Sequence, residues 1–162
     1  MTSRQKQLLV LIILLSVVIR VLAALYLGNQ VEVLPGTFDQ ISYHNLALRL
    51  TGGYGFTFGK SWWPVTAANA PTSHWSFFYT GYLFLIYKIF GPNPLIARLV
   101  QAVLVGIFQP LLAFLIGKEV FRIKVGIAAA IFTGLYSYFI YYAATLMTEP
   151  FYIVSILLCL WL

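Results

Sequence analysis

Charged side chains are scarce in this chain of 162 residues. They make up 9% of the sequence and only four residues are acidic, whereas a soluble domain carries about 25% charged residues. Together with 61% hydrophobic residues, this composition excludes an ordinary soluble domain and indicates a membrane protein. The net charge of +6 comes from basic residues scattered singly or in pairs, without a stripe that could follow phosphates, so no nucleic-acid partner is expected.

Cysteine and histidine are almost absent as well. Cys159 is the single cysteine, which excludes an internal disulfide and a cysteine-ligated metal site. His44 and His74 lie thirty residues apart and give no zinc-ligand spacing. A zinc site is therefore not expected, a role for another divalent metal stays open, and no organic cofactor is expected.

Long hydrophobic runs are what the sequence does have. Residues 8–27 form an apolar run, broken only by Ser16 and Arg20, that can cross about 30 Å of hydrocarbon as a first transmembrane helix. A cleaved signal peptide is the alternative, but its apolar core would span only about 7 to 15 residues. Arg4 and Lys6 precede the run, so the positive-inside rule places the N-terminus in the cytoplasm.

The segment that follows, residues 28–94, is predicted to be an external loop that carries two surface helices. The first helix is predicted over residues 39–51, where apolar side chains fall on one helical stripe and Gly52 and Gly53 follow as a terminator. The second is predicted over residues 75–90, which are rich in aromatic side chains and, at about 24 Å, too short to cross the bilayer. We expect both helices to lie along the membrane interface.

Charge also predicts how the remaining apolar runs cross the membrane. Residues 118–124 contain three basic residues and one acidic residue, so the positive-inside rule makes them a cytoplasmic loop. Residues 95–117 then enter as a second transmembrane helix, and residues 125–144 leave as a third. This threading brings Glu149 out on the same, extracytoplasmic face of the membrane as Asp39.

A last apolar run, residues 150–162, begins a fourth transmembrane helix that is too short to cross, at about 20 Å. We therefore expect the chain to be a truncated, N-terminal part of a larger protein. The predicted fold class is an all-α, multi-pass integral protein of the cell membrane, in which transmembrane helices are joined to an external loop with two interfacial helices.

Three segments behind the first span together carry a resemblance to a known family. They are FDQISYHNLALRLTGGYGFT (38–57), IYKIFGPNPLIARLVQ (86–101) and IGKEVFRIKVGIAAAIFTGLYSYFIYYAATLMTEP (116–150). This order of acid, glycine-rich turn, F-G-x-x-x-x-x-A-R (90–98), basic loop and second acid resembles the N-terminal module of polytopic GT-C glycosyltransferases, which include protein O-mannosyltransferases and lipid A aminoarabinose transferases. The resemblance implies an enzyme that takes a sugar from a polyprenyl-phosphate carrier and passes it to a glycan, lipid or protein acceptor.

The resemblance also implies which residues would form the site. Members of this family carry a catalytic or donor-site carboxylate in the first external loop, which matches Asp39, and a second external carboxylate, which matches Glu149. Gln40 stands where some members have a second acid, and Glu149 replaces the commoner Asp, so metal binding is left open.

The chemistry of glycosyl transfer gives these side chains roles. A carboxylate within about 2.6 to 3.2 Å of an acceptor hydroxyl can take its proton as the oxygen attacks the anomeric carbon, which is the role expected of Asp39. The leaving phosphate requires cations rather than an acid. Arg98 and Lys60 are the candidates, because a guanidinium pairs with phosphate oxygens in a fork and a lysine supplies a point charge.

Each of these side chains also has a purely structural interpretation. Asp39 could serve only as the N-cap of its helix, and Glu149, which precedes a proline, could only begin the next one. Arg98 lies near the end of a span, where an arginine can snorkel to the interface. The alternative function is a non-catalytic polytopic protein, either a lipid or solute transporter or an assembly subunit. Mid-span charges and repeated broken helices would favour a transporter.

Overall fold

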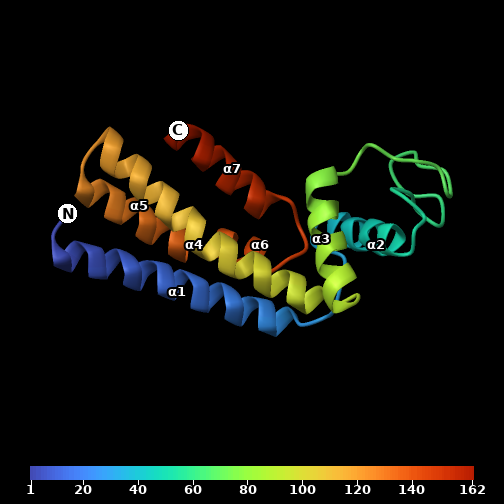
Figure 1. Ribbon diagram of the computed structural model, residues 1–162, viewed down its shortest axis with the longest axis horizontal. Helices are drawn as coiled ribbons and strands as arrows, with labels where there is room; N and C mark the ends of the chain where they lie inside the picture. The colour runs from blue at the N-terminus through green and yellow to red at the C-terminus, as the bar shows by residue number, and fades with distance from the viewer. The chain divides into compact units, whose positions relative to one another are not determined.

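The computed structural model describes residues 1–162 and is entirely helical, which confirms the predicted all-α class (Figure 1). Its seven helices are α1 (Ser3–Leu27), α2 (Asp39–Thr51), α3 (Phe77–Phe90), α4 (Pro94–Val120), α5 (Ile123–Leu135), α6 (Ser137–Ala143) and α7 (Glu149–Trp161). The only β-structure outside the helices is a set of isolated β-bridges.

The chain divides into two compact units. The helix unit comprises Met1–Leu27, Arg98–Thr145 and Glu149–Leu162, and it contains α1, most of α4, α5, α6 and α7. The loop unit comprises Gly28–Ala97 and Leu146–Thr148, and it contains α2 and α3. The membrane-crossing candidates and the polar loop residues thus belong to different units.

Two helices of the chain, α1 and α4, are long and apolar enough to cross a membrane. The bent pair α5 and α6 makes a third crossing if the two helices are counted as one span. The number of crossings and their direction stay predictions.

The segment predicted as one helix over residues 125–144 is in fact broken. Tyr136, between α5 and α6, has extended backbone angles (φ −66°, ψ 120°), and the two helices are bent by 53°. The break frees carbonyl groups in apolar surroundings, where each needs a donor. Arg20 supplies it: Nη1 donates to the carbonyl oxygen of Gly134 at 2.7 Å and Nη2 to that of Thr133 at 3.0 Å.

Small residues let the helices of the helix unit approach closely. A Cβ atom added at Gly117 of α4 would lie 2.9 Å from the Cα of Gly126 in α5, and one added at Gly106 would lie 2.9 Å from the Cα of Val17 in α1. Close backbone contact at small residues is typical of membrane helix pairs. In Figure 1, α1 runs alongside α4, in agreement with the contact between Gly106 and Val17.

The loop unit is built around α2 packed on α3. The buried side of α2 includes Tyr43 and Leu46, and that of α3 includes Tyr79 and Leu83. The rings of Tyr43 and Tyr79 meet edge to face with centroids 5.0 Å apart, an arrangement that stabilises aromatic pairs. Helix α3 begins two residues later than expected, because Ser76 caps it by accepting a hydrogen bond from the Tyr79 amide at 3.2 Å.

Candidate functional site

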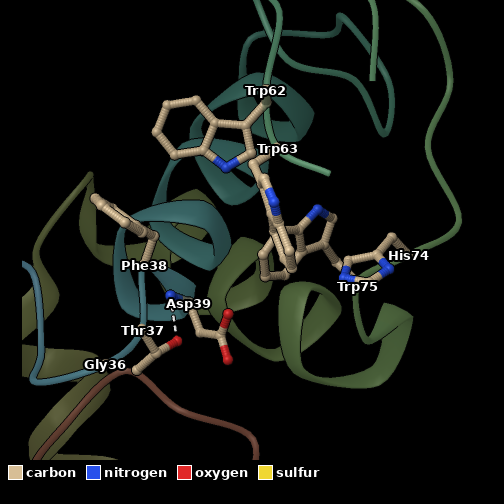
Figure 2. Close-up of a pocket in the computed structure, with 8 residues that line it drawn as sticks. All are labelled: Gly36, Thr37, Phe38, Asp39, Trp62, Trp63, His74 and Trp75. Atoms are coloured by element: carbon tan, nitrogen blue, oxygen red, sulfur yellow. Dashed lines mark hydrogen bonds between the residues drawn. The ribbon is translucent and has the colours of Figure 1, made fainter. Parts of the chain in front are cut away.

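The start of α2 borders a cavity of about 660 Å³ in the loop unit (Figure 2). Two stretches of the loop close it from the other side. The lining residues are Gly36, Thr37, Phe38, Asp39, Trp62, Trp63, His74 and Trp75. One carboxylate, one imidazole and three indoles therefore share the space.

Asp39 enters this cavity with its carboxylate unengaged. It is the first residue of α2, and the residue at the N-cap position is Phe38, so Asp39 is not the cap that the structural interpretation requires. The Asp39 amide donates to the Thr37 hydroxyl at 3.1 Å, the one hydrogen bond among the pocket residues in Figure 2, and its carboxylate accepts none from the chain. The position at a helix N-terminus still favours a negative charge electrostatically.

Trp62 forms a fixed wall of the cavity. Its Nε1 donates to the Ser42 hydroxyl on α2 at 2.8 Å, and its ring stacks on Phe58 with centroids 5.4 Å apart. Two backbone hydrogen bonds of 2.9 Å between Trp62 and Thr66 tie this part of the loop into a tight turn. The contacts that hold the Trp62 indole against α2 are not predictable from the sequence, which shows only that tryptophans are present in the loop.

His74 and Trp75 complete the aromatic wall. The His74 ring meets Trp63 at 5.8 Å and Trp75 at 5.0 Å, both edge to face. Trp75 is only 4% exposed, and its Nε1 is buried without a hydrogen-bond partner. Neither residue is predictable as a neighbour of Asp39 from the sequence, because both follow it by more than thirty positions and reach it only through the folding of the loop.

Gln40, the neighbour of Asp39, has a structural role instead. Its side-chain Nε2 donates to the Glu32 carbonyl at 3.0 Å, and its Oε1 accepts from the Leu146 amide at 2.9 Å. A carboxylate at this position could not make the first of these bonds. The loop unit therefore uses an amide here, and Asp39 stands as the one carboxylate of the cavity.

Lys60 lies at a second cavity of the loop unit, of about 410 Å³, which also contains Arg49. Its Nζ is 5.4 Å from the centre of the Trp62 ring, and Trp62 lines both cavities. The structure thus connects two of the predicted site residues, Asp39 and Lys60, through one shared indole.

Arg98 and Glu149, the other predicted site residues, belong to the helix unit. Arg98 is 1% exposed and donates through Nη1 to the carbonyl oxygen of Leu27, the last residue of α1, at 3.4 Å. Glu149 is half-buried and is the first residue of α7. The roles of both, and a site shared between Glu149 and Asp39, stay predictions.

No group of three or more His, Cys, Asp or Glu side chains comes together in a way that could hold a metal ion. Comparisons with protein-family models, with curated proteins and with solved structures found no match.

Proposed function

We propose that this protein is a membrane glycosyltransferase of the GT-C type, which moves a sugar from a polyprenyl-phosphate carrier to a hydroxyl acceptor on the extracytoplasmic face. The observation that carries the proposal is the cavity at Asp39, where an unengaged carboxylate faces a wall of three indoles and an imidazole. Its volume of about 660 Å³ falls in the range of small-molecule sites.

The aromatic wall suits a sugar ligand. Aromatic faces pack against the apolar C–H faces of a sugar ring, while the polar edge of the ring is left for hydrogen bonds. Trp62 is held by its bond to Ser42 and by its stacking on Phe58, so its indole keeps a fixed orientation in the cavity wall. Trp63, at 70% exposure, offers a second face at the mouth of the cavity. Pre-organised walls lower the entropic cost of ordering a ligand.

Asp39 supplies the base that glycosyl transfer needs. An acceptor hydroxyl is a weak nucleophile, and its proton must leave as its oxygen bonds to the anomeric carbon while the carrier phosphate departs with the electrons of the broken bond. A carboxylate with no partner in the chain is free to accept that proton. His74 lies in the same cavity and is a candidate to orient the acceptor.

A transporter has one observation in its favour, the charged Arg20 buried beside the broken pair α5 and α6. Such features often mark a transport pathway. However, the terminal nitrogens of Arg20 are engaged with Ser16, Gln109, Thr133 and Gly134. These bonds account for the buried charge as support for the helix break, so the transferase is preferred.

The test measures sugar release and transfer from a panel of polyprenyl-phosphate-linked hexoses by the wild-type protein in detergent or nanodiscs. Asp39→Asn should lower the rate by about 10² to 10⁴, the usual contribution of a general base. The matched control is Glu32→Gln, which removes the other, exposed acid of the loop unit and should leave the rate unchanged. Wild-type rates for Asp39→Asn would rule out the assignment of the base.

A further inference from the structure

We propose that Arg49 and Lys60 form a binding site for a phosphate group in the second cavity of the loop unit. This cavity, of about 410 Å³, is lined by residues of α2 and of the loop after it: Asn45, Leu48, Arg49, Phe58, Gly59, Lys60 and Trp62. Two cations and an amide line it, and no acidic residue does. An anion is therefore the ligand that its charge favours.

The guanidinium group of Arg49 is held in place by hydrogen bonds to uncharged side chains. Its Nε and Nη2 donate to the Thr57 hydroxyl at 3.2 and 3.0 Å, and Nη2 also donates to Asn69 Oδ1 at 2.7 Å. The guanidinium carbon lies 4.2 Å from the centre of the Tyr54 ring. These contacts fix the side chain without cancelling its charge, and the two N–H groups of Nη1 have no acceptor in the chain. A half-buried guanidinium held in this way is pre-organised for an anion.

Gly59 keeps the approach to this guanidinium open. A Cβ atom at Gly59 would lie 3.4 Å from Arg49 Nη1, so an alanine here would place a methyl group against the nitrogen whose N–H groups are unengaged. Lys60, the next residue, makes no ion pair and places its Nζ 5.4 Å from the Trp62 ring centre. The loop therefore brings a second positive charge to the cavity and leaves out the side chain that would obstruct the first.

A phosphate site in this cavity would add a donor-binding group to the proposed glycosyltransferase. The inference rests on that proposed function only for the identity of the molecule that carries the phosphate. Trp62 lines both cavities, so one ligand could place a phosphate against Arg49 and Lys60 and its sugar against the indoles near Asp39. The same chemistry would recognise the headgroup of an anionic bilayer lipid. Phosphate is common to both sources, and the experiment separates them.

The experiment measures binding of a short-chain polyprenyl phosphate to the full chain in neutral-lipid nanodiscs, beside the polyprenol of equal length. We expect the phosphate to bind at least about tenfold more tightly than the alcohol, since hydrogen bonds to charged groups are among the stronger ones. Lys60→Gln and Gly59→Ala should each weaken phosphate binding by about three- to tenfold. Neither variant removes a hydrogen bond that holds the loop, so both should fold.

The matched control is Lys88→Gln, which removes an exposed cation of α3 outside the cavity. Equal binding of phosphate and alcohol, or an equal loss in Lys88→Gln and Lys60→Gln, would overturn the site. Loss of the preference for phosphate over alcohol in phosphatidylglycerol nanodiscs would assign the site to lipid headgroups, and an unchanged preference there would assign it to the carrier. Phosphate binding that depends on Lys60 in a protein without transfer activity would keep the site and reject the transferase.

Discussion

Two buried polar side chains of the helix unit contrast with two polar side chains that line the cavities of the loop unit. In the helix unit, Arg20 is fully buried, yet its terminal nitrogens donate to carbonyl oxygens at the end of α5. Gln101 does the same for the end of α6, donating to the carbonyls of Ala143 at 3.0 Å and Thr145 at 2.8 Å. In the loop unit, by contrast, the Asp39 carboxylate and the Lys60 ammonium have no hydrogen-bond partner in the chain.

The presence or absence of hydrogen bonds within the chain is a better criterion than burial or charge for separating residues that stabilise the fold from candidates for ligand binding. A polar group in apolar surroundings is costly unless it is hydrogen-bonded, and a helix break creates carbonyls with the same need, so the pairing of Arg20 with α5 satisfies both partners. A polar group that has no hydrogen-bond partner at a cavity contributes little to the stability of the fold. We expect a ligand to engage such a group, whereas Arg20 and Gln101 are expected to act on the fold.

The first prediction concerns the side of the membrane on which each unit's exposed residues lie. In a Cys159→Ser background, a cysteine at Val65, which is 93% exposed in the loop unit, should react fully with an impermeant thiol reagent added outside intact cells. A cysteine at Phe121, 72% exposed between α4 and α5, should react only after permeabilisation. Labelling of Phe121→Cys from outside would contradict the threading based on the basic loop.

The second prediction removes the support at the helix break. Arg20→Met leaves the carbonyls of Thr133 and Gly134 without donors, at about 1 to 3 kcal/mol each, partly offset by removing a buried charge. We expect a net loss of about 3 kcal/mol, or roughly 6 to 12 °C in Tm measured by thermal aggregation in detergent. Arg122→Met, which removes an exposed cation at the start of α5, is the control and should change Tm little. Equal shifts would mean that the bonds of Arg20 stabilise nothing.

The third prediction applies the same logic to a residue of the loop unit whose side chain is engaged. Gln40→Leu leaves the Glu32 carbonyl and the Leu146 amide unpaired, so we expect a loss of about 2 kcal/mol, or roughly 4 to 8 °C in Tm. Asn45→Leu on the same helix is the control, because its amide forms no hydrogen bond within the chain and faces the second cavity. A larger loss of Tm in Asn45→Leu than in Gln40→Leu would mean that the hydrogen bonds of Gln40 do not stabilise the loop unit.

The sequence predicted features whose causes are local. Helix α2 has the predicted range because its apolar stripe and the glycines that end it are neighbours in the chain. The break at Tyr136 was not predictable, since the donor for its free carbonyls, Arg20, comes from a helix more than 110 residues earlier. Asp39 stands out in the sequence because acidic residues are rare. The proximity of His74 and Trp75 to Asp39, in contrast, depends on how the loop folds back.

The last prediction has the smallest effect on stability and returns to Asp39. Its carboxylate forms no hydrogen bond with the chain, so Asp39→Asn and Asp39→Ala should both lose only the interaction with the helix dipole, about 0.5 kcal/mol or roughly 1 to 2 °C in Tm. A capping carboxylate would behave differently, because Asn caps a helix about as well as Asp while Ala costs about 1 kcal/mol. A several-degree loss in Asp39→Ala alone would therefore contradict the structure, in which Phe38 and not Asp39 is at the N-cap position. Equal and small shifts in the two variants, measured on the same preparations that lose transfer activity, would mean that the carboxylate acts on a ligand rather than on the fold.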